Sequence, residues 1–198
     1  MQRFYELDFA TLCVSITPDI SGELSIKIRL VGNQTDLQTP FLAKTDRVKI
    51  RSCPNVIASL DCYFSGKPID HVGEFTRIKS NPSKFGVFSD FASKCYLELC
   101  RTNCGSLKTY KQLANKMNSR AYQAVGGALR RNRFPVLLPC HRIVGKSGLG
   151  GFMGKRSKLK GIDFLSKSEI EELLARQDIA EEIKVKVALI HHERLMAD

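Results

Sequence analysis

The first part of the chain alternates apolar and polar residues as β-strands do. The run from Leu24 to Leu30 places an apolar residue at every second position, which is the period of a half-buried strand. A second apolar segment extends from Phe4 to Ile16, and turn-forming residues fill the stretch from Pro18 to Gly22. We therefore predict a β-hairpin within a first third that consists of strands and turns.

The pattern changes near residue 80. Loop-forming residues, including a proline, occupy Ser80 to Ser83. Beyond them, apolar residues recur at spacings of three and four, at Phe91, Cys95, Tyr96 and Leu99. This spacing predicts an amphipathic helix. We place a domain boundary here, between an N-terminal domain of residues 1–86 and a second domain of residues 87–165.

Two short helices are predicted after Thr109. Thr109 can cap a helix from Lys111 to Met117, and Asn118 with Ser119 interrupts the pattern before a helix from about Arg120 to Arg131. Helix, tight turn and helix in a basic context suggest a helix-turn-helix, although such pairs also arise from plain packing.

The second of these helices carries little side-chain bulk. Its small residues are Ala121, Ala124, Gly126, Gly127 and Ala128. Each glycine inside a helix costs about 1 kcal/mol relative to alanine. Either another backbone approaches this helix closely, or it packs tightly against the preceding helix.

Residues 166–198 are predicted to form a helical tail packed on the body. Ser168 and Glu171 have the spacing of a capping box. Apolar residues follow at helical spacing, at Ile170, Leu173, Leu174, Ile183 and Val187. His191 and His192 are expected to be solvated surface residues rather than metal ligands.

Basic charge is concentrated in the middle of the chain. The net charge is +11 overall, but residues 1–86 contribute +2, residues 87–165 contribute +12 and residues 166–198 contribute −3. No carboxylate lies between Glu98 and Asp163. A segment of this kind attracts polyanions, and nucleic acid is the first candidate. The alternative is a basic face that only maintains solubility.

Composition removes other classes of protein. No apolar stretch approaches the ~20 residues of a membrane span. Glu6 and Asp8 lie where a signal peptide would have its apolar segment, so no signal peptide is expected. The seven cysteines show no paired CxxC spacing, so neither a disulfide framework nor a standard zinc cluster is indicated. We expect a cytoplasmic protein, nuclear in a eukaryote, without metal, cofactor or membrane partner.

The strongest candidate for chemistry is the run from Pro139 to Arg142, which places Cys140 beside His141 after the apolar segment Phe134–Leu138. Thiolates are strong nucleophiles, and a neighbouring base generates them. Many cysteines near a histidine are nevertheless inert buried residues.

Three motifs surround this pair in a specific order: TYKQLA at Thr109–Ala114, AVGGAL at Ala124–Leu129, and PCHRIV at Pro139–Val144, with Asn132 between the last two. Together they resemble the O6-alkylguanine-DNA alkyltransferases, which transfer an alkyl group from guanine to a cysteine. The resemblance covers roughly residues 88–155, and the first 86 residues match only in size and strand content.

The resemblance implies a fold and a reaction. It implies an α/β N-terminal domain with a ribonuclease H-like, strand-rich sheet and a helix. It also implies a mainly α second domain with a winged-helix-like helix-turn-helix. Cys140 would accept the alkyl group once, which inactivates the protein, and His141 would take the thiol proton through a water molecule. Asn132 would support the hinge before an active-site strand.

The resemblance also implies how the substrate binds. A flipped O6-alkylguanine would contact Tyr110, the carbonyls of Cys140 and Ile143, and the amide of Met153 beside Phe152, with Pro135 lining the alkyl pocket. Duplex DNA would bind through its minor groove, without sequence preference and to a monomer. The expected DNA-contacting residues are Ala121, Gln123, Ala124, Gly126, Gly127 and Arg130, with further phosphate contacts from Arg131 and Arg133.

Two positions depart from the family pattern. Gln123 stands where the family usually has an arginine that fills the gap left by the flipped base, which predicts weaker or differently distributed DNA binding. The carboxylate that orients the histidine is not at its usual place, and Asp163 or Glu169 are the candidates to replace it.

Three other functions remain open. An alkyltransferase-like lesion-binding module would lack the cysteine, and a helix-turn-helix regulator would be a dimer with no need for the thiol. A hydrolytic cysteine enzyme would need an oxyanion hole that the sequence does not identify.

Overall fold

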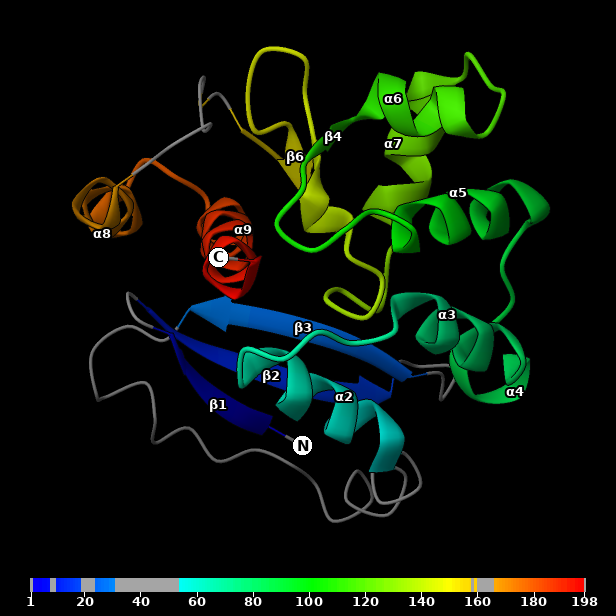
Figure 1. Cartoon of the computed structure of the whole chain (residues 1–198), viewed down its shortest axis with the longest axis horizontal. Coiled ribbons are helices and arrows are strands. Elements are labelled where there is room, and N and C mark those ends of the chain that lie inside the picture. Colours follow the sequence, from blue (N-terminus) through cyan, green and yellow to red (C-terminus); the bar gives the residue numbers. More distant parts are fainter. Residues whose placement is uncertain are drawn as a thin grey trace.

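The computed structural model describes residues 2–7, 10–18, 24–30, 54–157, 159 and 166–197 (Figure 1). Near the N-terminus, β1 (Gln2–Leu7), β2 (Ala10–Pro18) and β3 (Leu24–Leu30) form an antiparallel sheet in that order. In β3 the apolar positions Leu24, Ile26 and Ile28 are buried, while Lys27 and Arg29 are exposed. The predicted hairpin is therefore confirmed, and β1 adds a third strand.

Three helices follow that the sequence patterns did not predict: α2 (Pro54–Phe64), α3 (His71–Lys79) and α4 (Pro82–Phe85). The Asp70 side chain caps α3 by accepting from the Gly73 amide at 3.0 Å. The first third is thus not only strands and turns. The segment predicted as a loop at Ser80–Ser83 already contains the start of α4, because proline is well accommodated in a first helical turn.

The predicted helices around the helix-turn-helix are present. Phe91, Cys95 and Leu99 belong to α5 (Asp90–Cys100). Thr109, in the short strand β4 (Lys108–Thr109), caps α6 (Tyr110–Lys116) in a capping box with Gln112. The next helix, α7 (Tyr122–Arg130), begins and ends close to the predicted bounds. Buried Leu113, Val125 and Leu129 anchor this pair to the core.

The apolar run Phe134–Leu138 is buried and is not a strand, so Asn132 is followed by turns rather than by the strand that the resemblance implied. The chain turns there, and Val136 has a φ of 75°. A β-branched residue with positive φ is a rare and strained conformation. The run leads into a short 3₁₀ turn, η2 (Cys140–Arg142), then into β5 (Ile143–Val144), which pairs with β4 in parallel. The hairpin β6 (Gly151–Phe152) and β7 (Lys155–Arg156) follows.

The tail consists of α8 (Lys167–Ala175) and α9 (Glu181–Ala197). The capping box of α8 is Ser166 with Glu169, so the predicted pair of Ser168 and Glu171 is wrong. The sequence offers both pairs at the same spacing, and the helix begins at the earlier one.

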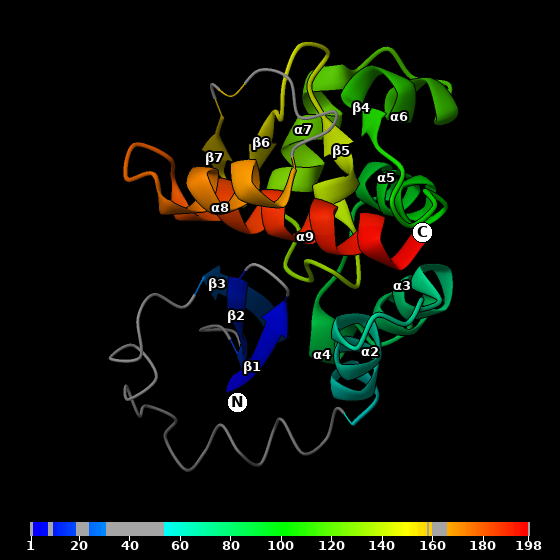
Figure 2. The ribbon, with the colours of Figure 1, turned by 60° about the vertical axis from the view of Figure 1, so that its left-hand side comes forward.

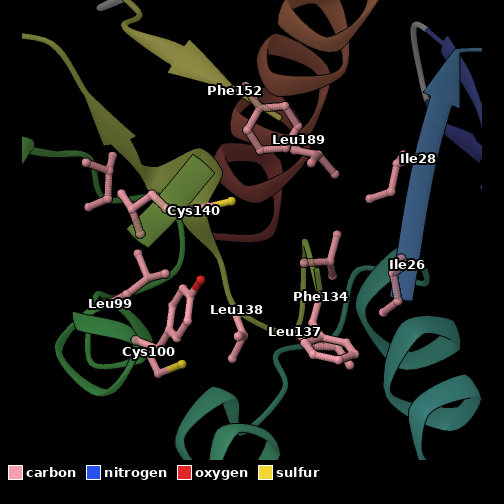
Figure 3. Packing of buried hydrophobic residues seen from close by; sticks show 14 of the residues in the cluster. Ile26, Ile28, Leu99, Cys100, Phe134, Leu137, Leu138, Cys140, Phe152 and Leu189 are labelled. Carbon is pink, nitrogen blue, oxygen red and sulfur yellow. The ribbon is translucent and has the colours of Figure 1, made fainter. Parts of the chain in front are cut away.

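Helix α9 is buried on every side along Val185–Ile190, because it lies between the N-terminal sheet and the helices and hairpin of the other half (Figure 2). Leu189 of α9 lies near Phe152 of β6 and faces Ile28 of β3 (Figure 3). His192 is also buried, and its Nε2 lies 3.0 Å from the Tyr63 carbonyl oxygen. The prediction that His192 is solvated was wrong, because Tyr63 and Phe64 of α2 cover this end of α9. None of the described helices is long and apolar enough to cross a membrane.

Candidate active site and DNA-facing surface

Cys140 begins η2 and is 6% exposed. Asn132 Nδ2 donates to Cys140 Sγ at 3.0 Å and to the Leu138 carbonyl at 2.8 Å, and Asn132 Oδ1 accepts from the Phe134 amide at 2.9 Å. Burial raises the pKa of the Cys140 thiol, while the Asn132 hydrogen bond and the charge of Lys186 lower it in part. The resting thiol is therefore protonated, and a reaction through the thiolate needs a base.

His141 is fully buried beside this thiol in sequence. Its Nε2 lies 2.7 Å from Glu193 Oε1, and since a carboxylate only accepts, Nε2 carries the proton. Nδ1 is then the basic nitrogen, and it is buried without a hydrogen-bond partner among the described residues. Burial lowers the pKa of His141, and Glu193 opposes that shift. The imidazole is therefore neutral at pH 7, with a free lone pair.

Glu193, in α9, holds the centre of a buried polar network. Arg142 donates to both carboxylate oxygens, from Nε at 2.8 Å and from Nη2 at 2.8 Å. The Tyr63 hydroxyl and the Gly105 amide donate to it at 3.0 and 3.2 Å. Burial alone would raise the pKa of Glu193, but the charges and hydrogen bonds of His141 and Arg142 outweigh it and hold the pKa well below its usual range. The carboxylate is ionised and fixes the orientation of His141.

The network continues into the N-terminal half through His71. Arg142 Nη2 lies 2.7 Å from His71 Nε2, and His71 Nδ1 lies 3.0 Å from the Leu137 carbonyl. Arginine has no acceptor, so His71 Nε2 accepts and Nδ1 donates to Leu137. Burial, followed by the charge of Arg142, lowers the pKa of His71 to about 4. His71 is thus a neutral link between the turn before Cys140 and the ion pair.

The orienting carboxylate was predicted wrongly. Glu169 caps α8 through Ser166, and Asp163 lies outside the described residues. Glu193 is 52 residues from His141. It ends a lysine-leucine-leucine-glutamate pattern of the family that we expected to be altered, and that reads here Lys186, Leu189, Ile190 and Glu193. The sequence also shows that this helix is buried: residues 185–190 are apolar except for Lys186. A single charged residue in such a stretch indicates a buried helix with specific polar partners.

A cavity of about 660 Å³ opens above the thiol. Residues of α6, α7 and the β6–β7 hairpin line it together with Cys140; they include Tyr110, Gln123, Gly126, Gly127, Arg130, Phe152, Met153, Lys155 and Arg156. Its lining holds three cationic side chains and no carboxylate among the described residues. The volume suits a ligand the size of a nucleobase, and the charge suits an anion.

The two glycines of α7 face this cavity rather than another helix. A Cβ added at Gly126 or Gly127 would meet no atom within 4 Å. The explanation by tight packing against the preceding helix is therefore wrong, and the slim face is left open. Met153 and Gly154 form a two-residue hairpin turn opposite this face, with φ values of 45° and 88°. Both central residues of a type I′ turn have positive φ, so the Met153 backbone is set by this turn.

The other predicted residues lie as follows. Ala124 of α7 and Ala121, the residue before that helix, are exposed, whereas Pro135 is buried and does not line the cavity. The Ile143 carbonyl already accepts a hydrogen bond from Lys186 Nζ at 2.5 Å. Arg133 is not available as a phosphate contact, because its Nη2 donates to the Leu24 and Phe85 carbonyls at 3.2 and 3.1 Å.

No group of three or more histidine, cysteine, aspartate or glutamate side chains within the described part of the chain is arranged to hold a metal ion.

Comparison with known proteins gives matches that agree with one another. Residues 90–169 match the family model of the 6-O-methylguanine DNA methyltransferase, DNA binding domain. The methylated-DNA--protein-cysteine methyltransferase of Sulfurisphaera tokodaii is 34% identical over 110 residues, which are 52% of this chain and 65% of that protein. The protein of the same name from Saccharolobus islandicus strain M.16.27 is 37% identical over 93 residues, 47% of this chain and 55% of that protein. The matched segment thus spans between half and two thirds of these relatives.

A solved structure shares the fold over more of the chain. The crystal structure of Mycobacterium tuberculosis OGT in complex with DNA superposes with a TM-score of 0.50 at 18% identity, covering 98% of this chain and 93% of that one. The fold is therefore that of the alkyltransferases, with mixed helices and small sheets. Residues 90–169, the segment that matches the model of the 6-O-methylguanine DNA methyltransferase, DNA binding domain, carry Cys140, His141 and most of the cavity lining.

Proposed function

We propose that this protein repairs duplex DNA by transferring the alkyl group of O6-alkylguanine directly to Cys140. The observation that carries the proposal is a buried thiol at the base of a cavity of about 660 Å³, beside a histidine whose proton position is fixed by Glu193. A structural cysteine needs neither the cavity nor the ordered base. The names of the relatives support the same reaction.

The chemistry follows from the protonation states. Nδ1 of His141 takes the Cys140 proton through a bridging water, and Glu193 stabilises the imidazolium that forms. The thiolate attacks the alkyl carbon in line, so that an S–C bond forms while the C–O6 bond breaks and its electron pair leaves with guanine, which then takes up a proton. The product thioether has no good leaving group. Each protein molecule therefore reacts once.

DNA would reach the thiol along α7. The open face at Gly126 and Gly127 allows close approach of a minor groove, and Arg130, Lys155 and Arg156 supply positive charge at the cavity. A guanine inside the stack hides O6, so the nucleotide must rotate into the cavity, between Tyr110 and the Met153 turn. The protein would act as a monomer, because one cavity holds one flipped base.

We propose three structural units that serve this reaction. Residues 1–86 form a ribonuclease H-like α/β domain, supported by the sheet β1–β3 with α2. Residues 87–165 form the DNA-binding and transfer domain, in which α6 and α7 are the helix-turn-helix and β6–β7 has the place of a wing. Residues 166–198 form a helical tail.

The test uses a duplex oligonucleotide with a single O6-methylguanine. We expect the wild-type protein to gain one methyl group, located on the Cys140 peptide by mass spectrometry, with a stoichiometry that stops at one. An unmethylated duplex is the substrate control. Cys62→Ala, at a half-buried cysteine of α2 outside the cavity lining, is the protein control and should react normally.

Cys140→Ala should bind the lesion and gain no mass. Binding of the lesion by wild-type protein without mass gain would instead identify a lesion-binding module, and repeated turnover would identify a hydrolytic enzyme. Either outcome would contradict direct transfer.

A further inference from the structure

A buried histidine of the N-terminal half contacts the chain on both sides of Cys140. His71 begins α3 and is 8% exposed. Its Nδ1 donates to the Leu137 carbonyl, three residues before the thiol, at 3.0 Å. Its Nε2 accepts from Arg142 Nη2, two residues after the thiol, at 2.7 Å. A single imidazole therefore connects the two ends of the 137–142 segment, which carries the thiol and its base.

The chain between α7 and η2 has no regular structure that could hold it in place. Residues 131–139 form turns and bends rather than a helix or a strand. Val136 has a φ of 75°, a conformation that persists in a β-branched residue only where the surroundings impose it. The Ile26 amide of β3 donates to the Arg133 carbonyl at 2.7 Å, which ties the start of this turn to the sheet. Its end, next to the thiol, needs a contact of its own.

Two polar side chains bind the end of the turn. Asn132 binds the Leu138 carbonyl and the Phe134 amide, but it belongs to the same segment and moves with it. His71 binds the neighbouring carbonyl, that of Leu137, from a helix 66 residues earlier in the chain. The histidine therefore ties the end of the turn to a separate element of the fold.

Local structure fixes His71 itself. Asp70 caps α3 by accepting from the Gly73 amide, so the helix begins at His71. Gly73 leaves room for this cap, because a Cβ there would collide with the Asp70 carboxylate. One imidazole nitrogen donates and the other accepts, so the neutral tautomer is fixed as well. The short run 70–73 thus presents an oriented donor to the turn.

We infer that His71 is a positioning residue for alkyl transfer, which through Leu137 holds the Cys140 thiol in a fixed place relative to its base. The effect on transfer rests on the proposed function, whereas the anchoring of the turn does not. His71 lies outside residues 90–169, which match the family model. The N-terminal half thus contributes a side chain to the chemistry as well as to the fold.

His71 is separate from the surface proposed to bind DNA. It lines a second cavity, of about 280 Å³, together with Tyr63, Thr102 and Arg142. None of these four residues lines the cavity above the thiol. A substrate in the cavity above the thiol would therefore not touch His71. Loss of the histidine contacts should slow the reaction without weakening the binding of DNA.

Isosteric substitutions separate the two contacts of His71. Asparagine places an amide N–H close to the position of Nδ1 and can still donate to Leu137. Glutamine places its amide close to the position of Nε2, where its oxygen can accept from Arg142 while its N–H does not reach Leu137. His71→Leu keeps the bulk and loses both contacts.

The first measurement is methyl transfer to methylated duplex under single-turnover conditions. His71→Leu and His71→Gln should lower the maximal rate constant by about tenfold or more, because small displacements of reacting groups cost at least that much. His71→Asn should recover most of this loss. Half-saturation by DNA should be unchanged in all three variants.

The matched control is Thr76→Ala. Thr76 is an exposed residue of α3, and its hydroxyl donates to the Val72 carbonyl at 2.9 Å, so the variant loses a hydrogen bond that does not reach the turn. Its transfer rate should equal that of wild type. Thermal unfolding of each variant identifies those that fold, and if His71→Leu does not, the comparison of His71→Asn with His71→Gln carries the test.

The second measurement needs no DNA. The Leu138 and Cys140 amides donate to the Phe134 and Leu138 carbonyls at 2.8 and 2.7 Å, so hydrogen exchange of this peptide reports how firmly the turn is held. Exchange should be faster in His71→Gln than in His71→Asn, which should match wild type.

Two results would overturn the inference, given a wild-type protein that transfers methyl. One is a folded His71→Leu protein that transfers at the wild-type rate. The other is equal transfer, or equal exchange, in the folded asparagine and glutamine variants. Failure of wild type to transfer methyl at all would overturn the proposed function instead, and the exchange measurement would still decide whether His71 anchors the turn.

Discussion

The two sides of the Cys140 site are built in different ways. On one side, residues 109–156 supply the thiol, the base and the cavity lining in consecutive elements, α6, α7, η2 and β6–β7. On the other side, α9 alone supplies Glu193 and Lys186 from a position 43 to 52 residues later in the chain. The first side faces an open cavity, and the second is completely buried.

The residues that would bind the substrate are therefore separate from the residues that would activate Cys140. The segment 109–156 presents glycines and cations where a substrate approaches, whereas α9 lies behind it and fixes the protonation state of His141 and the position of the Ile143 and Gly151 backbone. A change in α9 should therefore alter chemistry and stability at constant DNA affinity, and a change on the open face of α7 should do the reverse. The following predictions test that separation, from the largest effect to the smallest.

Glu193→Gln should have the largest effect. It leaves Arg142 buried without its anion and removes the charge that orients His141, so the free energy of unfolding should fall by about 3–5 kcal/mol. Methyl transfer should slow by at least ~100-fold, because base catalysis contributes about that much. Chemical denaturation and single-turnover assays measure the two effects. Glu182→Gln, in the first turn of α9, is the control, and equal losses in both variants would argue against a specific role of Glu193.

The His71 link to Arg142 makes the buried side sensitive to acid. The pKa of His71 is about 4 in the folded protein and ~6.5 in an unfolded chain, so the unfolded state binds more protons between these values. Stability is therefore present above pH 6.5 and is lost as pH falls towards 4, by about 3 kcal/mol from this residue. His141, whose pKa is also lowered, acts in the same direction.

Urea unfolding between pH 4 and pH 7 measures this loss. His71→Gln retains a donor and an acceptor but does not titrate, and its stability should depend less on pH over that interval. An unchanged slope would show that folding does not lower the pKa of His71.

Gly127→Ala should separate stability from binding on the open side. The new methyl group meets no atom within 4 Å, so the helix should gain about 1 kcal/mol of stability. If the α7 face enters a DNA groove, the same methyl group should weaken DNA binding several-fold. Thermal unfolding and fluorescence anisotropy with duplex DNA give the two values. A more stable variant with unchanged affinity would place the DNA elsewhere.

Gln123→Arg should have the smallest effect. Gln123 is exposed at the cavity mouth, where an added cation can contact a phosphate or fill the space left by the flipped base. One further phosphate contact steepens the slope of log affinity against log salt by about 0.9. Titrations at several salt concentrations measure it. Unchanged affinity and repair rate would show that the missing arginine is not what limits this protein.

The sequence predicted the open side much better than the buried side. Thr109, the two α7 glycines and the Cys140–His141 pair carry local signals, because caps, turns and adjacent reactive groups act within a few residues. Glu193 acts through a tertiary contact with His141, 52 residues away, and the pattern from Lys186 to Glu193 does not by itself show which histidine the carboxylate meets. The conformation of the apolar run Phe134–Leu138 was not predictable for a related reason: burial makes a run apolar without determining whether its backbone forms a strand or turns.

One prediction was wrong by only two residues along the chain. Ser166-x-x-Glu169 and Ser168-x-x-Glu171 overlap and satisfy the same capping rule, and only the packing of α8 selects the first. The α2 and α3 helices were missed because the alternating pattern at the start of the chain was extended too far along it.

The place of Glu193 in the chain also sets the order in which the site can assemble during synthesis. Arg142 and Glu193 are 51 residues apart, so at a typical rate of 5–20 residues per second a ribosome adds the carboxylate roughly 3 to 10 seconds after the Cys140 turn. During that interval, and in any product of premature termination before α9, the thiol has neither an oriented base nor a neighbouring ammonium. A nascent or truncated chain thus lacks the groups on which the proposed transfer depends, and the site is complete only when α9 has folded into place.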